Sequence, residues 1–203
     1  MSLSSKDCED KMIDPFSIAS VVLDGDRIHC RLMDEHDIPG LKDAAANPAI
    51  WDHMVFNASD PVEFEAYIDS MFSGYRSGIH VPLTVFSSTT RKPIGAIKIM
   101  YISVPDESVT LGGTWLNPDY WGTPANRELH RLLFGFCFDV LLANRIDIRI
   151  YTDNMRNISA MAKHGVVYEG TLRDARTARD GRKRDVSYFS ILAREWHSLS
   201  EPA

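Results

Sequence analysis

Cysteine is scarce in this chain of 203 residues, which contains three, at Cys8, Cys30 and Cys137. They are widely spaced, and neither a C-x-x-C pair nor a histidine spacing typical of zinc sites accompanies them. The pattern therefore indicates free thiols in a reducing compartment and no metal site. Because Cys137 shares a helical apolar stripe with its neighbours, we expect it in the core.

Long apolar runs are also missing, and no stretch approaches the roughly 20 apolar residues that a membrane helix needs. The first dozen residues are polar and charged, which argues against a secretory signal peptide. We therefore expect a cytoplasmic protein. Residues 1–14 lack periodicity and predict a flexible leader, whereas residues 15–203 are a natural size for one domain.

An excess of positive charge is absent as well, since 22 lysines and arginines stand against 28 aspartates and glutamates, for a formal net charge of -6. This balance argues against nucleic acid and anionic membranes as partners. The longest basic cluster, at 182–184, is flanked by Asp180 and Asp185 and indicates a solvated loop. Any anionic ligand must therefore be held by a local site.

The sequence does contain a clear succession of hydrophobic periods, with apolar residues recurring at intervals of two in some segments and of three or four in others. This order predicts a mixed α/β sheet with helices packed on it. The predicted elements are a strand pair at 18–23 and 27–32, helices following Asp34 and Asp60, strands at 81–85, 94–102 and 109–116, a helix at 126–143, a strand at 146–151, a short helix ending near Gly165, and a final strand pair at 166–168 and 186–192.

The most informative stretch runs from Gly112 to Glu128, from a strand through a short loop into the strongest predicted helix. A helix start presents backbone N–H groups that lack intrahelical acceptors, and it lies at the positive end of the helix dipole. It is therefore suited to a phosphate or pyrophosphate, to which Arg127 and Arg131 can add charge.

This stretch resembles the GNAT superfamily, in particular the branch of ribosomal-protein N-terminal acetyltransferases, in which a WGTxxNxE-type loop replaces a glycine-rich one. Downstream, Asn154 lies eleven residues before Gly165, as in the NxxSxxxxxxxG segment of that family. The similarity continues through 169–173, 180–185 and 191–196, and so spans roughly residues 20 to 196. It implies a GNAT-type mixed, mostly antiparallel central sheet flanked by helices.

The resemblance also implies acetyl-CoA as cosubstrate, with no metal. Backbone groups at 115–117 would pair with the pantetheine arm, and the following loop and helix start would surround the pyrophosphate. Asn154 would bind the arm or fix the neighbouring turn. The implied cofactor-binding residues are Trp115, Leu116, Asn117, Trp121, Gly122, Thr123, Ala125, Asn126, Arg127, Asn154 and Asn157.

Three departures from the family bear on function. Pro124 stands where many relatives have glycine and offers no N–H, but with Thr123 as cap and Pro124 first in the helix, the following amides would remain for the phosphates. Asn157 and Met161 stand where relatives carry a serine or a tyrosine that protonates the departing thiolate. Thr110 replaces a glutamate that accepts the proton of the amine.

No conventional acid or base is therefore visible, and water can relay the protons instead. In GNATs the two-helix region before the third strand walls the acceptor site, although aromatic residues there more often serve packing. The weak catalytic candidates are Asn157, Ser159 and Glu107, with His53 and Asp52 as further candidates for a distal base, and the substrate-binding candidates are Trp51, His53 and Tyr67.

These features favour transfer of an acetyl group from acetyl-CoA to a primary amine by direct attack, the amine being a small molecule or a peptide N-terminus. Two alternatives stay open. One is a degenerate GNAT-fold protein that binds CoA or acyl-CoA without acetyl transfer, and the other is a biosynthetic enzyme that uses the fold for a different reaction. The protein would be a monomer or a homodimer.

Overall fold

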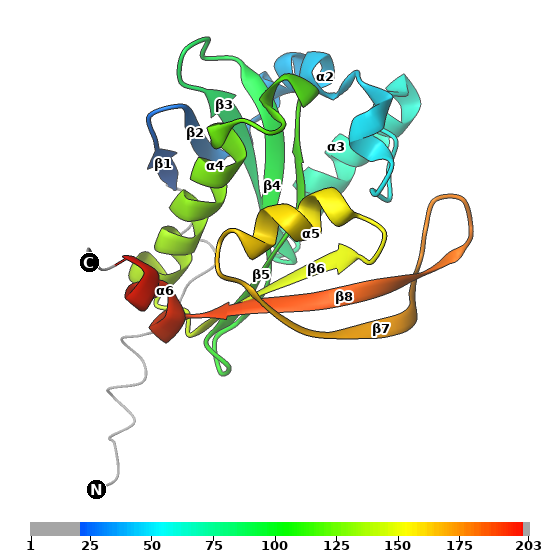
Figure 1. The fold of residues 1–203 in the computed structure, drawn as a ribbon. Coiled ribbons are helices and arrows are strands. Elements are labelled where there is room, and N and C mark those ends of the chain that lie inside the picture. Colours follow the sequence, from blue (N-terminus) through cyan, green and yellow to red (C-terminus); the bar gives the residue numbers. More distant parts are fainter. Residues whose placement is uncertain (1–20, 201–203) are drawn as a thin grey trace, which may run out of the picture.

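A computed structural model describes residues 21–200, which form an eight-stranded sheet flanked by helices (Figure 1). The strand order is β1-β2-β3-β4-β5-β6-β8-β7, and every neighbouring pair is antiparallel except β5 and β6. The predicted mixed, mostly antiparallel sheet is therefore confirmed. The strands are β1 (Val22–Asp24), β2 (Ile28–Leu32), β3 (His80–Ser87), β4 (Pro93–Ser103), β5 (Ser108–Leu116), β6 (Arg145–Tyr151), β7 (Val167–Thr177) and β8 (Lys183–Leu192), and the α-helices are α2 (Ile38–Ala45), α3 (Pro61–Arg76), α4 (Pro124–Gly135), α5 (Met155–Ala162) and α6 (Ala193–Ser200).

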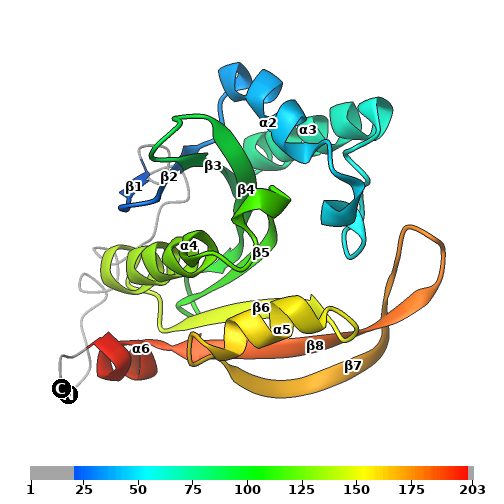
Figure 2. The same ribbon diagram turned by 45° about the horizontal axis from the view of Figure 1, so that its top comes forward.

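Two apolar cores lie on opposite faces of the sheet. The larger packs α4 and α5 against the strands and includes Leu129 and Leu133, both fully buried, together with Cys137 in its predicted core position. The smaller packs α2 and α3 against the other face and includes Trp51 and Tyr67. Figure 2 separates the two layers, with α2 and α3 lying away from α4 and α5.

Local side chains set where the helices begin. Asp60 accepts hydrogen bonds from the backbone N–H groups of Val62 and Glu63, and Pro61 is the first residue of α3, as the sequence predicts. Proline is well tolerated there because the N–H that it lacks would have no intrahelical acceptor. The same arrangement starts α4, the helix beside the site.

The structure differs from the predicted elements in three places. α4 ends at Gly135 and continues as a π-helical turn, Phe136–Val140, instead of one helix to 143. β7 is much longer than the predicted strand. Its residues are mostly polar and exposed and carry no alternation, so the sequence pattern does not reveal most of the strand. The helix α6 is absent from the predicted set. The predicted leader at 1–14 and the start of the strand at 18–23 lie outside the described residues.

None of the helices within residues 21–200 is long and apolar enough to cross a membrane.

Candidate acetyl-CoA and acceptor site

The candidate site is built where two central strands separate. β5 and β6 pair in parallel only between 108–111 and 145–148. Beyond Leu111, β5 continues to Leu116 alongside β4 on its other edge. Within residues 21–200, no strand therefore pairs with residues 112–116 of β5 on the side that faces β6. Backbone N–H and C=O groups need hydrogen-bond partners, so this edge suits a ligand that carries amide groups.

Two hydrogen bonds show which residues face the gap. The Asn117 N–H donates to the Ile94 carbonyl at 2.7 Å, so the Asn117 backbone is paired with β4. The indole Nε1 of Trp121 donates to the Leu116 carbonyl at 2.8 Å, from the side away from β4. Since alternate residues of a strand direct their backbone groups to opposite edges, Thr114 and Leu116 face the gap, and Asn117 does not.

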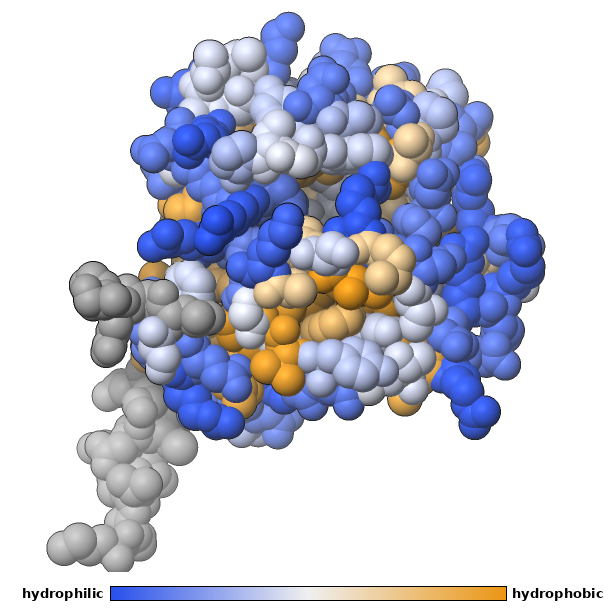
Figure 3. All heavy atoms as spheres, viewed as in Figure 1, coloured by the Kyte–Doolittle hydropathy of each residue, from blue (hydrophilic) through white to orange (hydrophobic). Residues whose placement is uncertain are grey.

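A cavity of about 580 Å³ lies at this gap. Its floor is the end of β5, one wall is the loop and first turns of α4, and the other wall is α5. It also reaches the turn η3 (Pro48–Trp51) and the residues after it, which belong to the α2 and α3 side of the sheet. In Figure 3 the surface is hollowed above α5, with hydrophilic side chains along the rim and apolar ones over α5.

The cavity is positively charged. Arg127, Arg156 and Lys163 line it, and no aspartate or glutamate of the described residues does. In a chain with a net charge of -6, this is a marked local concentration of positive charge. The guanidinium carbon of Arg156 lies 3.6 Å from the ring centre of Trp121, so a cation–π contact joins α5 to the loop before α4. The cavity therefore fits an anionic ligand such as a phosphate.

The start of α4 supplies a backbone donor to this cavity. Thr123 caps the helix and Pro124 is its first residue, which confirms the predicted helix start. The Ala125 N–H donates to the Thr123 hydroxyl at 3.3 Å, so this amide is engaged within the protein. The next amide, that of Asn126, has no intrahelical acceptor because it lies in the first turn. It is therefore the donor left for an anion, beside the side chain of Arg127.

The start of α5 completes the opposite wall. The Asn154 side-chain oxygen accepts a hydrogen bond from the Asn157 N–H at 3.2 Å, which caps the helix. Both side chains line the cavity, and so does Ser159. The bond fixes the turn at the helix start, one of the two roles that the family resemblance implies for Asn154.

Two histidines lie between α4 and α5 at the cavity wall. The rings of His130 and His164 are 5.3 Å apart, centre to centre. Burial lowers the pKa of His130, whose Nδ1 lies 2.8 Å from the Asn126 carbonyl oxygen. Burial, and then the nearby His130 and Arg127, lower the pKa of His164 to about 4. Both rings are therefore neutral at neutral pH, and the arginines and the lysine carry the charge.

The lowered pKa of His164 predicts acid sensitivity. In the unfolded state this histidine binds a proton near its ordinary pKa of about 6.5, whereas in the folded protein it does so only near pH 4. Between these values the unfolded state binds more protons, so stability is present above about pH 6.5 and is lost as the pH falls toward 4. We expect His164→Asn to reduce this loss of unfolding free energy by about 1 kcal/mol or more. Urea unfolding at several pH values measures it.

An unchanged slope in the His164 variant would show that this ring does not carry the effect.

The predicted site residues divide into two groups. Asn117 is paired with β4, and Ala125 is buried beneath the helix start at 3% exposure. Glu107 lies in the turn that precedes β5, at the opposite end of this strand from the cavity. The predicted residues that line the cavity are His53, Trp115, Leu116, Trp121, Gly122, Thr123, Asn126, Arg127, Asn154, Asn157 and Ser159.

The aromatic substrate-binding candidates are packing residues in this structure. Trp51 is 2% exposed, and its indole N–H donates to the Ala45 carbonyl. Tyr67 is 1% exposed, and its hydroxyl accepts a hydrogen bond from the Trp115 indole at 2.8 Å. His53 does line the cavity, and its Nδ1 lies 3.4 Å from an Asp153 carboxylate oxygen without hydrogen-bond geometry.

Sequence reasoning did not single out three residues that line the cavity, Arg156, Lys163 and His164. A signal for them was present. Arg156, Ala160 and Lys163 are separated by four and three residues, and His164 follows Ala160 by four, so these residues share one face of α5 and of the turn that ends it.

Comparison with known proteins identifies similar sequences. Residues 27–167 match the model of the Acetyltransferase (GNAT) domain family. A curated protein of Bacillus licheniformis, described as uncharacterized N-acetyltransferase p20, is 33% identical over 81 residues. The aligned part covers 40% of this chain and spans less than half of that relative, 45%.

Solved structures share the fold over most of the chain. A GCN5-related N-acetyltransferase from Brucella melitensis has a TM-score of 0.81 at 22% identity, with 88% of this chain and 81% of that one covered. Spermidine N-acetyltransferase from Vibrio cholerae, in complex with CoA and spermine, has a TM-score of 0.69 at 18% identity over 85% and 99% of the two chains. Ribosomal-protein-S5-alanine acetyltransferase from Vibrio fischeri has a TM-score of 0.70 at 17% identity over 90% and 100%. At these identities the likeness concerns the fold.

Proposed function

Because the chain belongs to the GNAT family of acetyltransferases, we propose that it transfers an acetyl group from acetyl-CoA to a primary amine, either of a small molecule or of a peptide N-terminus. The observation that carries this proposal is the cavity between β5 and α5. It combines an unpaired strand edge, a helix start and three cations in one place. Relatives with this fold include enzymes that are named for a small polyamine and for a ribosomal protein.

The residues of the cavity fit the parts of acetyl-CoA. The backbone groups of Thr114 and the N–H of Leu116, whose carbonyl already accepts from Trp121, would pair with the amides of the pantetheine arm. The Asn126 amide and the Arg127 side chain would hold the pyrophosphate, with Arg156 and Lys163 adding charge. The bound thioester supplies an activated acetyl group, and these contacts orient it.

We infer that the protein accelerates the reaction mainly by orienting the reactants. The cavity reaches η3 on the α3 side of the sheet, so an amine could approach from the face opposite α5. Asn157 can donate a hydrogen bond toward the sulfur but cannot give up a proton at neutral pH. A thiol of this kind has an expected pKa of about 8.5, so water can protonate the departing thiolate. Positioning alone can supply a large part of the rate enhancement.

This mechanism predicts that no side chain is indispensable as an acid. Asn157→Ala and Ser159→Ala should each lower turnover by less than about tenfold, because proton transfer by a positioned group is typically worth about a hundredfold or more. Turnover is measured at saturating acetyl-CoA, and calorimetric binding of CoA to each variant serves as the control. If Ser159→Ala loses turnover but keeps CoA binding, a dedicated acid exists. The same outcome for Asn157→Ala would show that its hydrogen bond is essential, which also contradicts a mechanism based mainly on orientation.

The proposed function itself is tested by incubating the protein with acetyl-CoA and a panel of primary amines, and measuring the release of free thiol. Amine-dependent release, with the acetylated amine identified by mass spectrometry, is the expected result. Tight CoA binding without thiol release from any amine would instead indicate a protein that binds acyl-CoA without transferring the acetyl group.

A further inference from the structure

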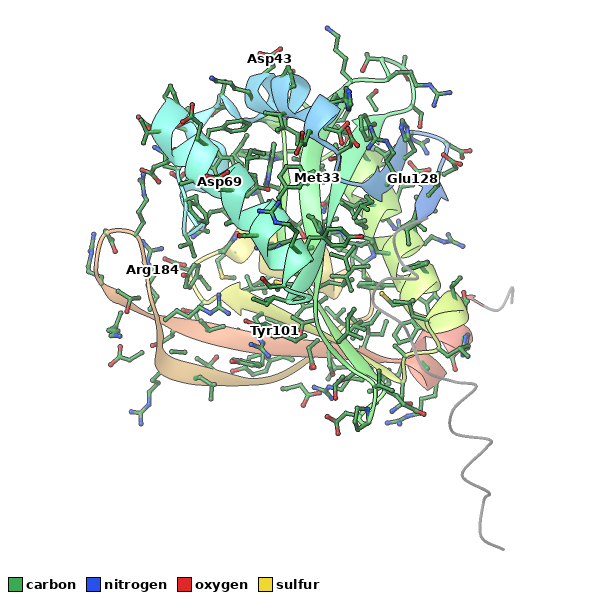
Figure 4. The ribbon with its side chains drawn as sticks, turned by 180° about the vertical axis from the view of Figure 1, so that it is seen from behind. Met33, Asp43, Asp69, Tyr101, Glu128 and Arg184 are labelled. Atoms are coloured by element: carbon green, nitrogen blue, oxygen red, sulfur yellow. The ribbon has the colours of Figure 1, made fainter. Side chains whose placement is uncertain are left out.

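The face of the sheet opposite α4 and α5 carries a lysine, Lys98, that forms no ion pair within residues 21–200. On this face α3 crosses β3 and β4, whereas within residues 21–200 no helix covers β6, β8 and β7 (Figure 4). Lys98 stands on β4, opposite Gly112 of β5. Its neighbours Ile97 and Ile99 point into the core on the α4 side, so Lys98 points to the open face.

Gly113 allows the Lys98 side chain to lie directly over β5. A Cβ atom at Gly113 would lie 3.4 Å from Lys98 Nζ but only 2.6 Å from Lys98 Cε, which is closer than two non-bonded carbon atoms can approach. Gly113 also has a φ of 63°, which a residue with a side chain rarely adopts. Gly113 directly precedes Thr114, which lines the cavity, so Lys98 packs over the residue adjacent to the cavity lining.

No anionic group balances this amine. Among the described residues, no carboxylate lies within ion-pair distance of Lys98, and its charged neighbours are Arg176 of β7 and the titratable His80 of β3. Burial, and then Arg176, lower the pKa of Lys98. Burial, and then Lys98, lower the pKa of His80. No carboxylate raises either pKa, so Lys98 lies among groups that supply no counter-charge.

The carboxylates of the neighbouring strands and loops are paired with arginines. Arg145 lies 2.8 Å from an Asp147 oxygen and 2.9 Å from a Glu169 oxygen. Arg179 lies 3.4 Å from a Glu63 oxygen, and Arg184 lies 3.1 Å from an Asp153 oxygen. None of these carboxylates forms an ion pair with Lys98.

Arg149 adds a second group that lacks an acceptor. It follows Ile148, the last residue of β6 that pairs with β5, and so stands where the strands begin to separate. Its guanidinium carbon lies 5.0 Å and 5.3 Å from the ring centres of Tyr101 and Tyr188. The Arg149 Nε is buried with no hydrogen-bond partner, as is the Tyr151 hydroxyl two residues on. Buried donors of this kind favour a ligand that brings an acceptor.

We propose that the acceptor amine carries a carboxylate a few bonds from its nitrogen, that Lys98 binds this carboxylate, and that Arg149 and Arg176 strengthen the positive field around it. This inference rests on the proposed acetyl transfer and identifies the chemical class of its acceptor. A carboxylate would supply the counter-charge that Lys98 lacks, whereas a polycationic acceptor would be repelled by the same field.

The test compares matched amines that differ in this one group. β-Alanine and β-alaninamide, L-serine and L-serinamide, and spermidine are assayed for thiol release with acetyl-CoA, and each is titrated by calorimetry into the protein saturated with CoA. We expect each carboxylate to be preferred over its amide by about tenfold or more in both measurements, because a charge-assisted hydrogen bond distinguishes them. Spermidine should be the weakest acceptor.

Variants assign the preference to Lys98. Lys98→Met keeps the length of the side chain and should abolish the preference by raising the KM for the carboxylates, and Lys98→Arg should restore it in part. Removing a partly buried, unpaired charge should not lower the melting temperature of Lys98→Met. Arg182→Gln is the matched control, because Arg182 is 82% exposed and already contacts Asp180, and it should leave the preference unchanged.

The binding measurement separates this inference from the proposed function. If no amine releases thiol but the carboxylates still bind more tightly than the amides, acetyl transfer is refuted and the carboxylate site stands. If amides or spermidine bind and react as well as the carboxylates, or if Lys98→Met keeps the preference, the carboxylate site is refuted while acetyl transfer stands.

Discussion

Trp51→Ala is expected to lower the free energy of unfolding by about 3 to 5 kcal/mol, the usual cost of truncating a buried tryptophan. Trp51 is 2% exposed and lies against two other aromatic rings, with its ring centre 5.5 Å from that of Tyr67 and 5.2 Å from that of Trp115. The truncation leaves a cavity in the smaller core and removes the donor to the Ala45 carbonyl. Urea unfolding at pH 7 measures the loss, and Trp51→Phe, which keeps most of the ring volume, should cost clearly less.

This result would separate packing from substrate recognition at Trp51. Because Trp115 lines the cavity between β5 and α5 and packs against Trp51, the smaller core supports one end of the candidate site. A variant of unchanged stability that loses activity would contradict the packing role and return Trp51 to the acceptor-binding residues suggested by its place in the sequence.

Most of the fold is predictable because its elements carry local signals. The alternation at Ile146, Ile148 and Ile150 locates β6, and the pairs Asp60-Pro61 and Thr123-Pro124 locate the starts of α3 and α4. β7 is predicted far too short because an edge strand with polar, exposed residues needs no hydrophobic period. The π-helical turn after Gly135 also has no local signal, since the apolar stripe continues through it.

The site is less predictable because its chemistry depends on distant pairings. That β5 and β6 stop pairing after Leu111 and Ile148 cannot be read from β6, because its alternation continues through Ile150. In β5 the pair Gly112-Gly113 follows Leu111, a pattern that indicates an irregular strand but does not say which neighbour it leaves. The position of Lys98 over Gly113 likewise depends on the register between β4 and β5. The helix start at Thr123 and the cap at Asn154 are local and were predictable, and these two features bound the cavity.

Arg127→Glu is expected to weaken CoA binding by about 100-fold at low salt. Removing a charge-assisted hydrogen bond typically costs about 1.5 to 3 kcal/mol, and the new carboxylate adds repulsion of the phosphates, so a total of about 3 kcal/mol is reasonable. The effect should shrink as salt is added, because Arg127 is exposed and its field is screened. Calorimetric titration of CoA at low and high salt measures both.

The matched control is Arg131→Glu, one helical turn further along α4. Arg127 lines the cavity between β5 and α5 and also the neighbouring pocket on the side of β1, whereas Arg131 lines only that second pocket. The two variants therefore make the same change of net charge at different distances from the cavity. If binding depended on the overall charge of the protein, both variants would weaken it equally. A selective loss in Arg127→Glu would place the phosphates at the start of α4, and unchanged binding in this variant would remove the helix start from the site.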